Sequence, residues 1–501
     1  MLTTLIFLPL LAGLLAAMMP RDAQARTVGL LGTAATFLLS LLLLANFNAN
    51  DSGSFRYATQ VDWLPILHVQ FSVGVDGPAV LLVLLTTFLH LMAAVFAQNT
   101  IRERERAFYA LLLLLEGTVI GAFVSLDALL FYVFFEACLI PSYFLIGIFG
   151  GRRRVQAATK FFVYTVVGSL VMLASIIGLY LATNSFEVSG PVGRAVSGSM
   201  IPLATQLLLF GGFAIAFAVK TGLFPLHTWL PDTYAEAPPV VTALLSGVLA
   251  KLGTYGFYRF CLQAFPDAAA RFAPFLVGLG VISIVYGAFI AAAQTDARRV
   301  IAYSSISHLG FVVAGLFSLT PEGLSGSILQ MVNHGITSGA LFLMLGMILA
   351  RRGTTHLRAL GGLWEQMPVF ARFFLIVTLS AVGLPLTNGF TGEFLILLGT
   401  FQTFPWLAAI GTTGVIWSAI YMFGMFQRAM YGPVDRRENR RLLDLTGTEK
   451  AILVPFIALI FLLGIYPAPI FRGIQTAVSE TLRNRGEQLT PVLNTPVAQN
   501  R

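Results

Sequence analysis

Repeated apolar runs of membrane-crossing length are the feature that most constrains this chain. A helix needs about 20 consecutive apolar residues to cross a hydrocarbon core roughly 30 Å thick. Of the 501 residues, 57% are hydrophobic and only 11% are charged, whereas soluble chains carry about 25% charged residues. The sequence therefore predicts an all-α integral membrane protein and not a set of soluble domains.

The apolar runs define fourteen candidate spans. They are residues 3–20, 27–46, 77–97, 107–125, 127–149, 157–182, 203–224, 237–264, 273–294, 299–319, 324–350, 368–398, 404–432 and 449–472. Several are longer than a straight crossing requires, which predicts tilted or broken helices. The first run has no basic leader and no small-residue cleavage pattern, so we expect a retained span and not a signal peptide.

The basic residues indicate how the chain is oriented. Net charge is +8, but the lysines and arginines form short clusters between apolar runs, which is typical of cytoplasmic loops and not of a nucleic-acid surface. With the N-terminus outside, inner loops hold 21 of the 31 Lys and Arg, the outer loops and tail hold eight, and Lys220 and Lys251 fall inside spans. This asymmetry predicts that both termini face the outer side.

Two segments are expected at the outer surface. Residues 48–76 alternate apolar and polar positions, which favours a short hairpin, and the polar tail after residue 472 is expected to begin as a surface helix and then become disordered. The two cysteines, Cys138 and Cys261, lie far apart in apolar runs and make neither a metal framework nor a disulfide framework. They are interpreted as small core residues.

Ionisable residues in the middle of spans carry the functional interpretation. They are Glu136, Lys220, Lys251, His308, His334 and Glu393. A charge at the centre of a span costs roughly 2.5–3.5 kcal/mol, so each needs a partner or a function. A buried lysine can release its proton near neutral pH, so lysines beside acids and imidazoles are suited to proton transfer.

The alternative is that such residues only pin helix packing. We favour that alternative for His90, which stands alone in its span, and it stays open for His334. Asp127 lies at a span end and is expected to be a solvated helix cap. Glu116 lies in mid-span without an evident partner.

Two spans contain helix-breaking residues beside an ionisable group. Gly222 and Pro225 follow Lys220, and Gly383 and Pro385 precede Glu393. Broken spans at matching positions indicate inverted repeats, with ions or water held at the break. We therefore predict two inverted five-helix repeats with broken helices 7 and 12, an arrangement that sets Lys220 opposite Glu393 and Glu136 opposite His308. The expected units are residues 1–106, 107–264 and 265–432, a last span at 433–472, and the tail 473–501.

Several motifs resemble one known family. The stretches KTGLFPLHTWLPDTYAEAPPVVTALLSGVLAKLGTYGFYRF, AQTDARRVIAYSSISHLGF and NHGITSGALF are similar to the antiporter-like subunits of proton-pumping NADH:quinone oxidoreductase, respiratory complex I. The resemblance runs from about residue 70 to 432 and more weakly to 470. The acid in GFTGEFLIL resembles the M branch (chain 4 of the mitochondrial enzyme), whereas the L and N branches and Mrp antiporters usually have lysine there.

The resemblance implies roles for the buried residues. It implies that Glu136 and Lys220 are a coupling ion pair and that Lys251 is the central proton relay. It also implies that Glu393 is the proton-loading site on the outer side, and that His308 and His334 bridge Lys251 to it. The family commonly has a histidine two residues after the aspartate of LPD, where this chain has Tyr234.

The resemblance also implies cofactors and partners. No cofactor or metal is expected in this chain, and NADH, FMN, iron–sulfur clusters and quinone are expected in partner subunits. The partners would be other membrane-arm subunits, above all the sister antiporter-like subunits, together with lipid, in a bacterial inner membrane; thylakoid is the alternative location. No CxxC, haem, P-loop or dinucleotide motif is present. An Mrp-type cation/proton antiporter and a hydrogenase-type membrane subunit remain as alternative functions.

Overall fold

The N-terminal part holds three spans and a hairpin. The computed structural model describes residues 1–47, 55–64, 69–188, 201–434 and 436–483. Its first elements are α1 (Leu2–Met18), α2 (Asp22–Ala45), β1 (Arg56–Leu64), β2 (Val69–Val75) and α3 (Gly77–Thr100). The two strands pair antiparallel, which confirms the hairpin predicted within 48–76, although residues 48–54 and 65–68 lie outside the described part. Asp76 caps α3 by accepting from the Ala79 amide at 3.0 Å.

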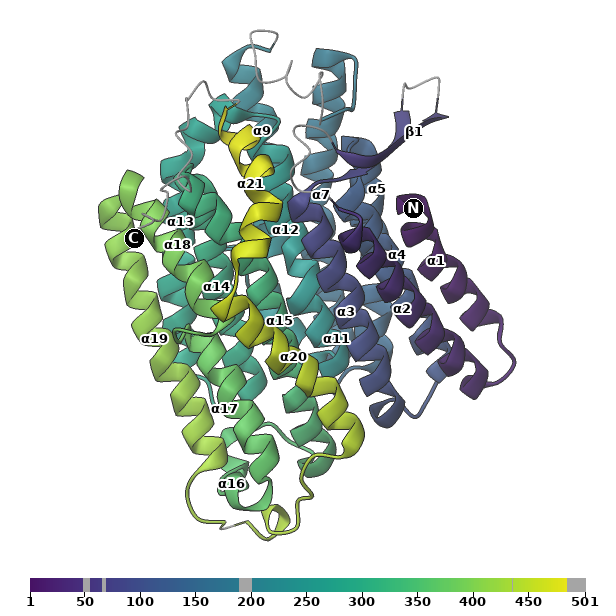
Figure 1. Cartoon of the computed structure of the whole chain (residues 1–501), viewed down its shortest axis with the longest axis vertical. Coiled ribbons are helices and arrows are strands. Elements are labelled where there is room, and N and C mark those ends of the chain that lie inside the picture. The colour runs from purple at the N-terminus through teal and green to yellow at the C-terminus, as the bar shows by residue number, and fades with distance from the viewer. Residues whose placement is uncertain (48–54, 65–68, 189–200, 435, 484–501) are drawn as a thin grey trace, which may run out of the picture.

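Two runs of helices follow and form the body of the molecule (Figure 1). The first run is α4 (Glu105–Val124), α5 (Ala128–Ala137), α6 (Leu139–Phe149), α7 (Arg154–Thr183), α9 (Leu203–Thr221), α10 (Trp229–Glu236), α11 (Pro239–Leu244), η2 (Leu245–Leu249), α12 (Ala250–Gly256) and η3 (Phe257–Leu262). The second run is α13 (Pro266–Ala292), α14 (Ala297–Ser318), α15 (Pro321–Arg352), η4 (Leu357–Ala359), α16 (Leu363–Gln366), α17 (Pro368–Val382), α18 (Asn388–Thr403) and α19 (Pro405–Met430).

The C-terminal part crosses the face of this body. It consists of η5 (Arg437–Asn439), α20 (Gly447–Ile465) and α21 (Ala468–Arg483), and α20 and α21 lie in front of α15 and α3 in Figure 1. Helix α21 is the surface helix predicted at the start of the tail, and its apolar side is buried against the protein. Residues 484–501, for which disorder is predicted, lie outside the described part.

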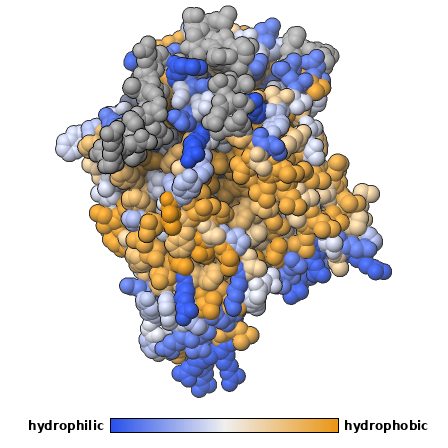
Figure 2. All heavy atoms as spheres, viewed as in Figure 1, coloured by the Kyte–Doolittle hydropathy of each residue, from blue (hydrophilic) through white to orange (hydrophobic). Residues whose placement is uncertain are grey.

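Twelve of the fourteen predicted spans correspond to described helices long and apolar enough to cross a membrane. The other two are shorter apolar helices, Leu2–Met18 and Pro368–Val382. The second is short because the predicted span 368–398 is divided between α17 and α18. Figure 2 shows the hydrophobic band that these helices present, with hydrophilic residues at the lower end of the molecule.

Burial separates central helices from peripheral ones. The apolar windows of α14 and α15 are 94% buried and that of 239–262 is fully buried, whereas those of α2, α19 and α20 are about one-third buried, at 33% each. Spans buried on all sides can carry polar groups that face other helices and not lipid. Lys251, His308 and His334 lie on these central helices.

Both predicted helix breaks are present and have the same local structure. α9 ends at Gly222 (φ +76°) and α17 at Gly383 (φ +79°), a left-handed conformation that favours glycine. The Leu223 amide donates to the Ala218 carbonyl, and the Leu384 amide donates to the Leu379 carbonyl, both at 3.0 Å. Both breaks are therefore Schellman caps, which is consistent with equivalent positions in two repeats.

The repeat itself stays a prediction, and the proposed correspondence of single residues is weakened by the breaks. Lys220 lies two residues before Gly222, on the first half of its broken span, whereas Glu393 lies ten residues after Gly383, on the second half. The two residues therefore do not occupy matching places relative to the two caps.

Two irregularities were not predicted. The span 127–149 is interrupted at Cys138, between α5 and α6. Helix α12, which carries Lys251, is flanked by the π-helical turns η2 and η3. Such turns are rare and are often found at functional sites.

Candidate functional site

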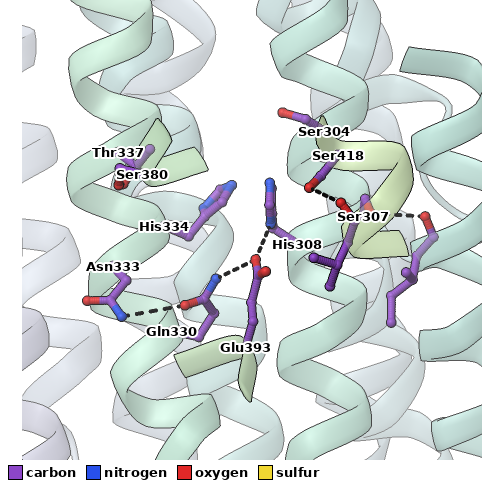
Figure 3. A network of polar contacts seen from close by, with 12 residues as sticks. Ser304, Ser307, His308, Gln330, Asn333, His334, Thr337, Ser380, Glu393 and Ser418 are labelled. Atoms are coloured by element: carbon purple, nitrogen blue, oxygen red, sulfur yellow. Dashed lines mark hydrogen bonds and ion pairs between the residues drawn. The ribbon is translucent and has the colours of Figure 1, made fainter. Parts of the chain in front are cut away.

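Four of the six predicted site residues form one contact chain in the centre of the molecule. Lys251 Nζ lies 2.7 Å from His334 Nδ1, and the rings of His334 and His308 are 5.6 Å apart between centroids. His308 Nδ1 lies 2.7 Å from Glu393 Oε1. All four residues are buried. Figure 3 shows His334 and His308 facing each other across the space between α15 and α14.

Neutral amides complete the surroundings of the Glu393 carboxylate. Gln330 Nε2 donates to Glu393 Oε1 at 3.0 Å, so this oxygen accepts from both the imidazole and the amide. Asn333 Nδ2 reaches the Gln330 carbonyl oxygen at 3.5 Å. The acid is thus held in a defined place by side chains of α14 and α15.

Reciprocal bonds fix the second helix break against α15. Asn333 Nδ2 donates to the Asn388 carbonyl at 2.6 Å, and Asn388 Nδ2 donates to the Asn333 carbonyl at 3.3 Å. Ser380 donates to Asn388 Oδ1 at 2.5 Å and is 2.7 Å from Thr337 Oγ1. The end of α17 and the start of α18 are therefore tied to the helix that carries His334.

A small polar cavity lies among these residues. Its volume is about 20 Å³, and its lining includes His308, His334, Gln330, Asn333 and Glu393. A water molecule needs a cavity of roughly 10–15 Å³ on this measure and two or more polar partners. The cavity is large enough to hold one water molecule and has polar residues in its lining to bond it, beside two imidazoles that no hydrogen bond among the described residues joins directly.

Lys251 is held at the other end of the chain. Its ammonium donates to the Ser246 carbonyl at 2.5 Å as well as to His334. Ser246 belongs to the π-helical turn η2, and its hydroxyl is 3.2 Å from the Ser305 hydroxyl of α14. The irregular turn thereby offers a carbonyl to a lysine that is fully buried.

Glu136 and Lys220 do not form the predicted ion pair. In the described part of the chain, Lys220 Nζ contacts Cys138 Sγ at 3.5 Å and lies 4.6 Å from the centroid of the Phe135 ring. Glu136 lies near enough for its charge to interact with Lys220, and its buried Oε1 lacks a hydrogen-bond partner among the described residues. The thiol and the ring, and not the carboxylate, lie next to the ammonium.

Among the described residues, no hydrogen bond joins Lys220 to the contact chain that begins at Lys251, so that chain runs only from Lys251 to Glu393. Thr221, next to Lys220, packs against Gly253 of α12, and its hydroxyl has no hydrogen-bond partner in the described part of the chain.

The other polar residues noted in the sequence have structural surroundings. His90 is fully buried, and its Nδ1 bonds the Thr86 carbonyl of its own helix at 2.8 Å. Asp127 caps α5 by accepting from the amides of Leu129 and Leu130, both at 2.9 Å. Asp127 is 3% exposed, so the expected solvated cap is instead a buried cap, and burial raises its pKa to about 6.

Glu116 is fully buried in α4, and both its carboxylate oxygens lack a hydrogen-bond partner among the described residues. The structure brings it into no contact with the four-residue chain.

Sequence reasoning missed the polar stripe of α15. Gln330, Asn333, His334 and Thr337 follow the spacing i, i+3, i+4, i+7, which places them on one helix face. All four line the central cavity. That spacing in a span that is otherwise apolar was a signal that could have identified them.

Arg259 was also missed, because the charge count assigned it to the outer loops. It is 1% exposed and pairs with Asp76 at 2.7 Å. Its guanidinium also donates to the Tyr255 hydroxyl at 3.1 and 3.0 Å and to the Gln263 amide oxygen at 2.9 Å. This arginine fixes the end of the Lys251 span to the start of α3.

Asp232, in the LPD motif, is held by two cations. Lys160 lies 2.7 Å and Arg299 3.0 Å from its carboxylate. Partial burial acts to raise the pKa of Asp232, but the hydrogen bonds and charges of Lys160 and Arg299 outweigh it and lower that pKa below its usual value. The carboxylate therefore stays ionised and links α7, α10 and α14. Tyr234 nearby is buried, and its carbonyl accepts from Arg298 at 2.9 Å.

Metal ligation is not indicated by the described side chains: among them, no group of three or more His, Cys, Asp or Glu residues is placed to hold an ion.

Comparisons with known proteins identify relatives of this chain. Residues 125–419 match the family described as NADH:quinone oxidoreductase/Mrp antiporter, transmembrane. The chain is 40% identical over 498 residues to NADH-quinone oxidoreductase subunit M of Rhodobacter capsulatus, an alignment covering 97% of this chain and 96% of the relative.

Comparison with solved structures points to the same family. A chain of respiratory complex I from Thermus thermophilus with bound NADH is 34% identical, with a TM-score of 0.89, and the match covers 97% of this chain and 100% of that one. A chain of the Mrp complex from Dietzia sp. is 22% identical, with a TM-score of 0.86, and the match covers 96% and 97%; this likeness is one of fold alone. From its sequence and its fold, the chain belongs to the NADH:quinone oxidoreductase/Mrp antiporter transmembrane family.

Proposed function

We propose that this chain is a subunit M that translocates protons within a membrane-bound NADH:quinone oxidoreductase, through Lys251, His334, His308 and Glu393. The observation that carries the proposal is the contact chain itself: two hydrogen-bonded contacts of 2.7 Å at its ends and a water-sized polar cavity in between. The 40% identity to a subunit M over nearly the whole chain supports the assignment within the family.

In this proposal each group has one task. Lys251 and Glu393 change protonation state, and the two histidines pass the proton, one ring nitrogen receiving it while the other releases it. Gln330 holds the acceptor oxygen of Glu393 in line with His308. Lysine suits the inner end of the relay because, unlike arginine, it can lose its proton when buried.

Lys220 and Glu136 have a separate task. Because they are near each other without touching, a small displacement of α5 or α9 changes their electrostatic interaction. We assign them the coupling of the relay to events elsewhere in the complex. The partners in this proposal are the other membrane-arm subunits, above all the sister antiporter-like subunits, and the redox cofactors belong to partner subunits. The membrane is a bacterial inner membrane, with both termini outside.

A matched pair of histidines tests the relay. In the intact complex, His308→Leu should lower the number of protons pumped per quinone reduced, because it removes the link to Glu393. His90→Leu also removes a buried histidine, but one bonded only to its own helix, and should leave that ratio unchanged. Equal ratios in the two variants, in vesicles with equal complex content, would contradict the relay.

An Mrp-type antiporter is the competing function, because the fold is shared with such a complex. The same vesicles distinguish the two: proton movement by an antiporter requires Na⁺ or K⁺ on the opposite side, whereas proton movement by a redox-driven pump requires NADH and quinone.

A further inference from the structure

A large apolar hollow opens on the face shown in Figure 2, within its hydrophobic band. Its volume is about 360 Å³, and α2, α3, α15, α20 and the start of α21 form its walls. Nearly all of the side chains that line it are aliphatic or aromatic. They include Leu41, Leu84, Val332, Ile336 and Tyr466.

The floor of the hollow is the back of the relay helix. Val332 and Ile336 of α15 line it, and they are the positions on either side of the turn that directs Asn333 and His334 towards the central cavity. Leu85 of α3 packs against Gly335 in the same turn. An occupant of the hollow therefore lies one helix thickness away from His334.

One end of the hollow carries a positive charge. There Gly77 of α3 packs directly against the backbone of Gly473 in α21, which closes the space. Tyr466 lines the hollow at this end, and its hydroxyl accepts from Arg472 Nη2 at 3.3 Å. Arg472 is exposed and forms no ion pair with another described residue, so its guanidinium is available to an anion.

Size and charge together select the occupant. A transmembrane helix is about 10–12 Å across with its side chains, far wider than an alkyl chain. Alkyl chains are thin enough to enter. An apolar tail that ends in a phosphate matches an apolar lumen with an arginine and a phenol at its mouth.

We propose that this hollow binds one phospholipid, with acyl chain against Val332 and Ile336 and phosphate on Arg472. The site extends from the outer ends of α2 and α3 to mid-membrane depth, which is the extent of one leaflet. The bound chain packs against the back of α15 and fills the apolar space between α2, α3 and α20. The proposal does not depend on the proton-relay assignment, because it rests on other residues.

Photo-crosslinking in the intact complex tests the proposal. The complex is purified, incubated with phosphatidylglycerol that carries a diazirine in its tail, irradiated and mapped by peptide mass spectrometry. Leu84 of α3, which lines the hollow, should be labelled, and unlabelled phosphatidylglycerol should compete. Leu42 is 54% exposed and does not line the hollow, so it reports contact with bulk lipid, which a small amount of competitor should not reduce.

Two matched pairs of variants locate the headgroup and the tail. Arg472→Gln should lower the labelling of Leu84 about tenfold, the effect of losing one charged hydrogen-bonding contact, whereas Arg483→Gln on the same helix should not. Leu41→Trp, inside the hollow, should abolish labelling, whereas its neighbour Leu42→Trp should preserve it.

Three results would overturn the proposal. Labelling of Leu84 that does not respond to competitor would show bulk lipid only. A diazirine diacylglycerol lacks the phosphate. If it labels Leu84 as strongly as phosphatidylglycerol does, and Arg472→Gln does not change that labelling, then Arg472 does not bind the phosphate. A protein–protein crosslink from Leu84 to another subunit would show that a partner chain fills the hollow.

Discussion

The two groups of ionisable residues in this chain are built differently. Lys251 and Glu393 are the ends of a contact chain of four buried side chains, three of which lie on the most deeply buried helices. Glu136 and Lys220 have no contact with each other, and Glu136 lies on a helix that is only partly buried. A buried group must find its polar partners within the chain, whereas a group near the periphery can be reached by a neighbouring subunit or by water. The first group is therefore suited to conducting protons, and the second to responding to a neighbouring subunit.

The largest effect is expected at the inner end of the contact chain. Lys251→Met removes the ammonium that contacts His334 and the Ser246 carbonyl, and proton pumping should fall roughly tenfold or more, as when a positioned proton-transfer group is lost. Lys251→Arg should pump no better, because arginine keeps its charge but cannot release a proton. The measurement is the NADH-driven pH gradient in inverted vesicles with equal complex content. Full proton pumping by Lys251→Arg would show that Lys251 acts only as a fixed positive charge.

The second-largest effect is expected at Glu393, the outer end of the contact chain. Glu393→Gln keeps the shape and the contact with Gln330 but loses the titratable group, so an assembled complex should pump several-fold less, again by loss of a proton-transfer group. Glu393→Lys, which places the residue of the sister subunits there, should retain more activity than glutamine. If the acid serves only as a counter-charge for neighbouring cations, lysine should be the worse of the two, because it puts like charges together. Protons pumped per quinone reduced distinguishes the two roles.

The transmembrane architecture was accessible from the sequence because its signals are large and local. A run of about 20 apolar residues has few alternatives to a span, and glycine and proline at 222, 225, 383 and 385 marked both helix breaks. The interruption at Cys138 and the π-helical turns beside Lys251 were missed although Pro141 and Gly247 stand beside them. Pro141 has no N–H to donate to the carbonyl of Ala137, the last residue of α5, and this signal was overlooked because the surrounding run is uniformly apolar.

The site was predicted as far as charge alone reveals it. Charged residues are conspicuous in an apolar span because their burial is costly, so all four members of the contact chain were identified. Gln330, Asn333 and Asn388 were not, because neutral amides attract less notice although they position the acid and the helix break. The ion pair predicted for Glu136 and Lys220 is absent among the described residues, where the ammonium lies beside Cys138 and Phe135, an arrangement that only the three-dimensional packing reveals.

A smaller effect is expected at Glu136. Because its carboxylate acts on Lys220 only over a distance, Glu136→Gln should leave the complex assembled and lower coupled pumping roughly two- to threefold, the scale of a partly screened charge interaction. The same substitution at Glu393 is the comparison, measured in the same vesicles. A loss at Glu136 as large as that at Glu393 would mean that the first group conducts protons too, and the contrast between the two groups would fail.

The smallest effect is expected at Cys138, whose thiol contacts Lys220. A thiol is a weak hydrogen-bond acceptor, so Cys138→Ala should cost less than about 1 kcal/mol of stability and leave pumping near the unsubstituted level. Cys138→Asp is the informative counterpart, because it places a carboxylate where the sulfur now contacts the ammonium at 3.5 Å. A fixed ion pair there should hold Lys220 charged and weaken coupling, although Glu136 is untouched. If Cys138→Asp pumps as well as Cys138→Ala, the charge state of Lys220 does not matter to coupling, and the open arrangement around this lysine has no functional meaning.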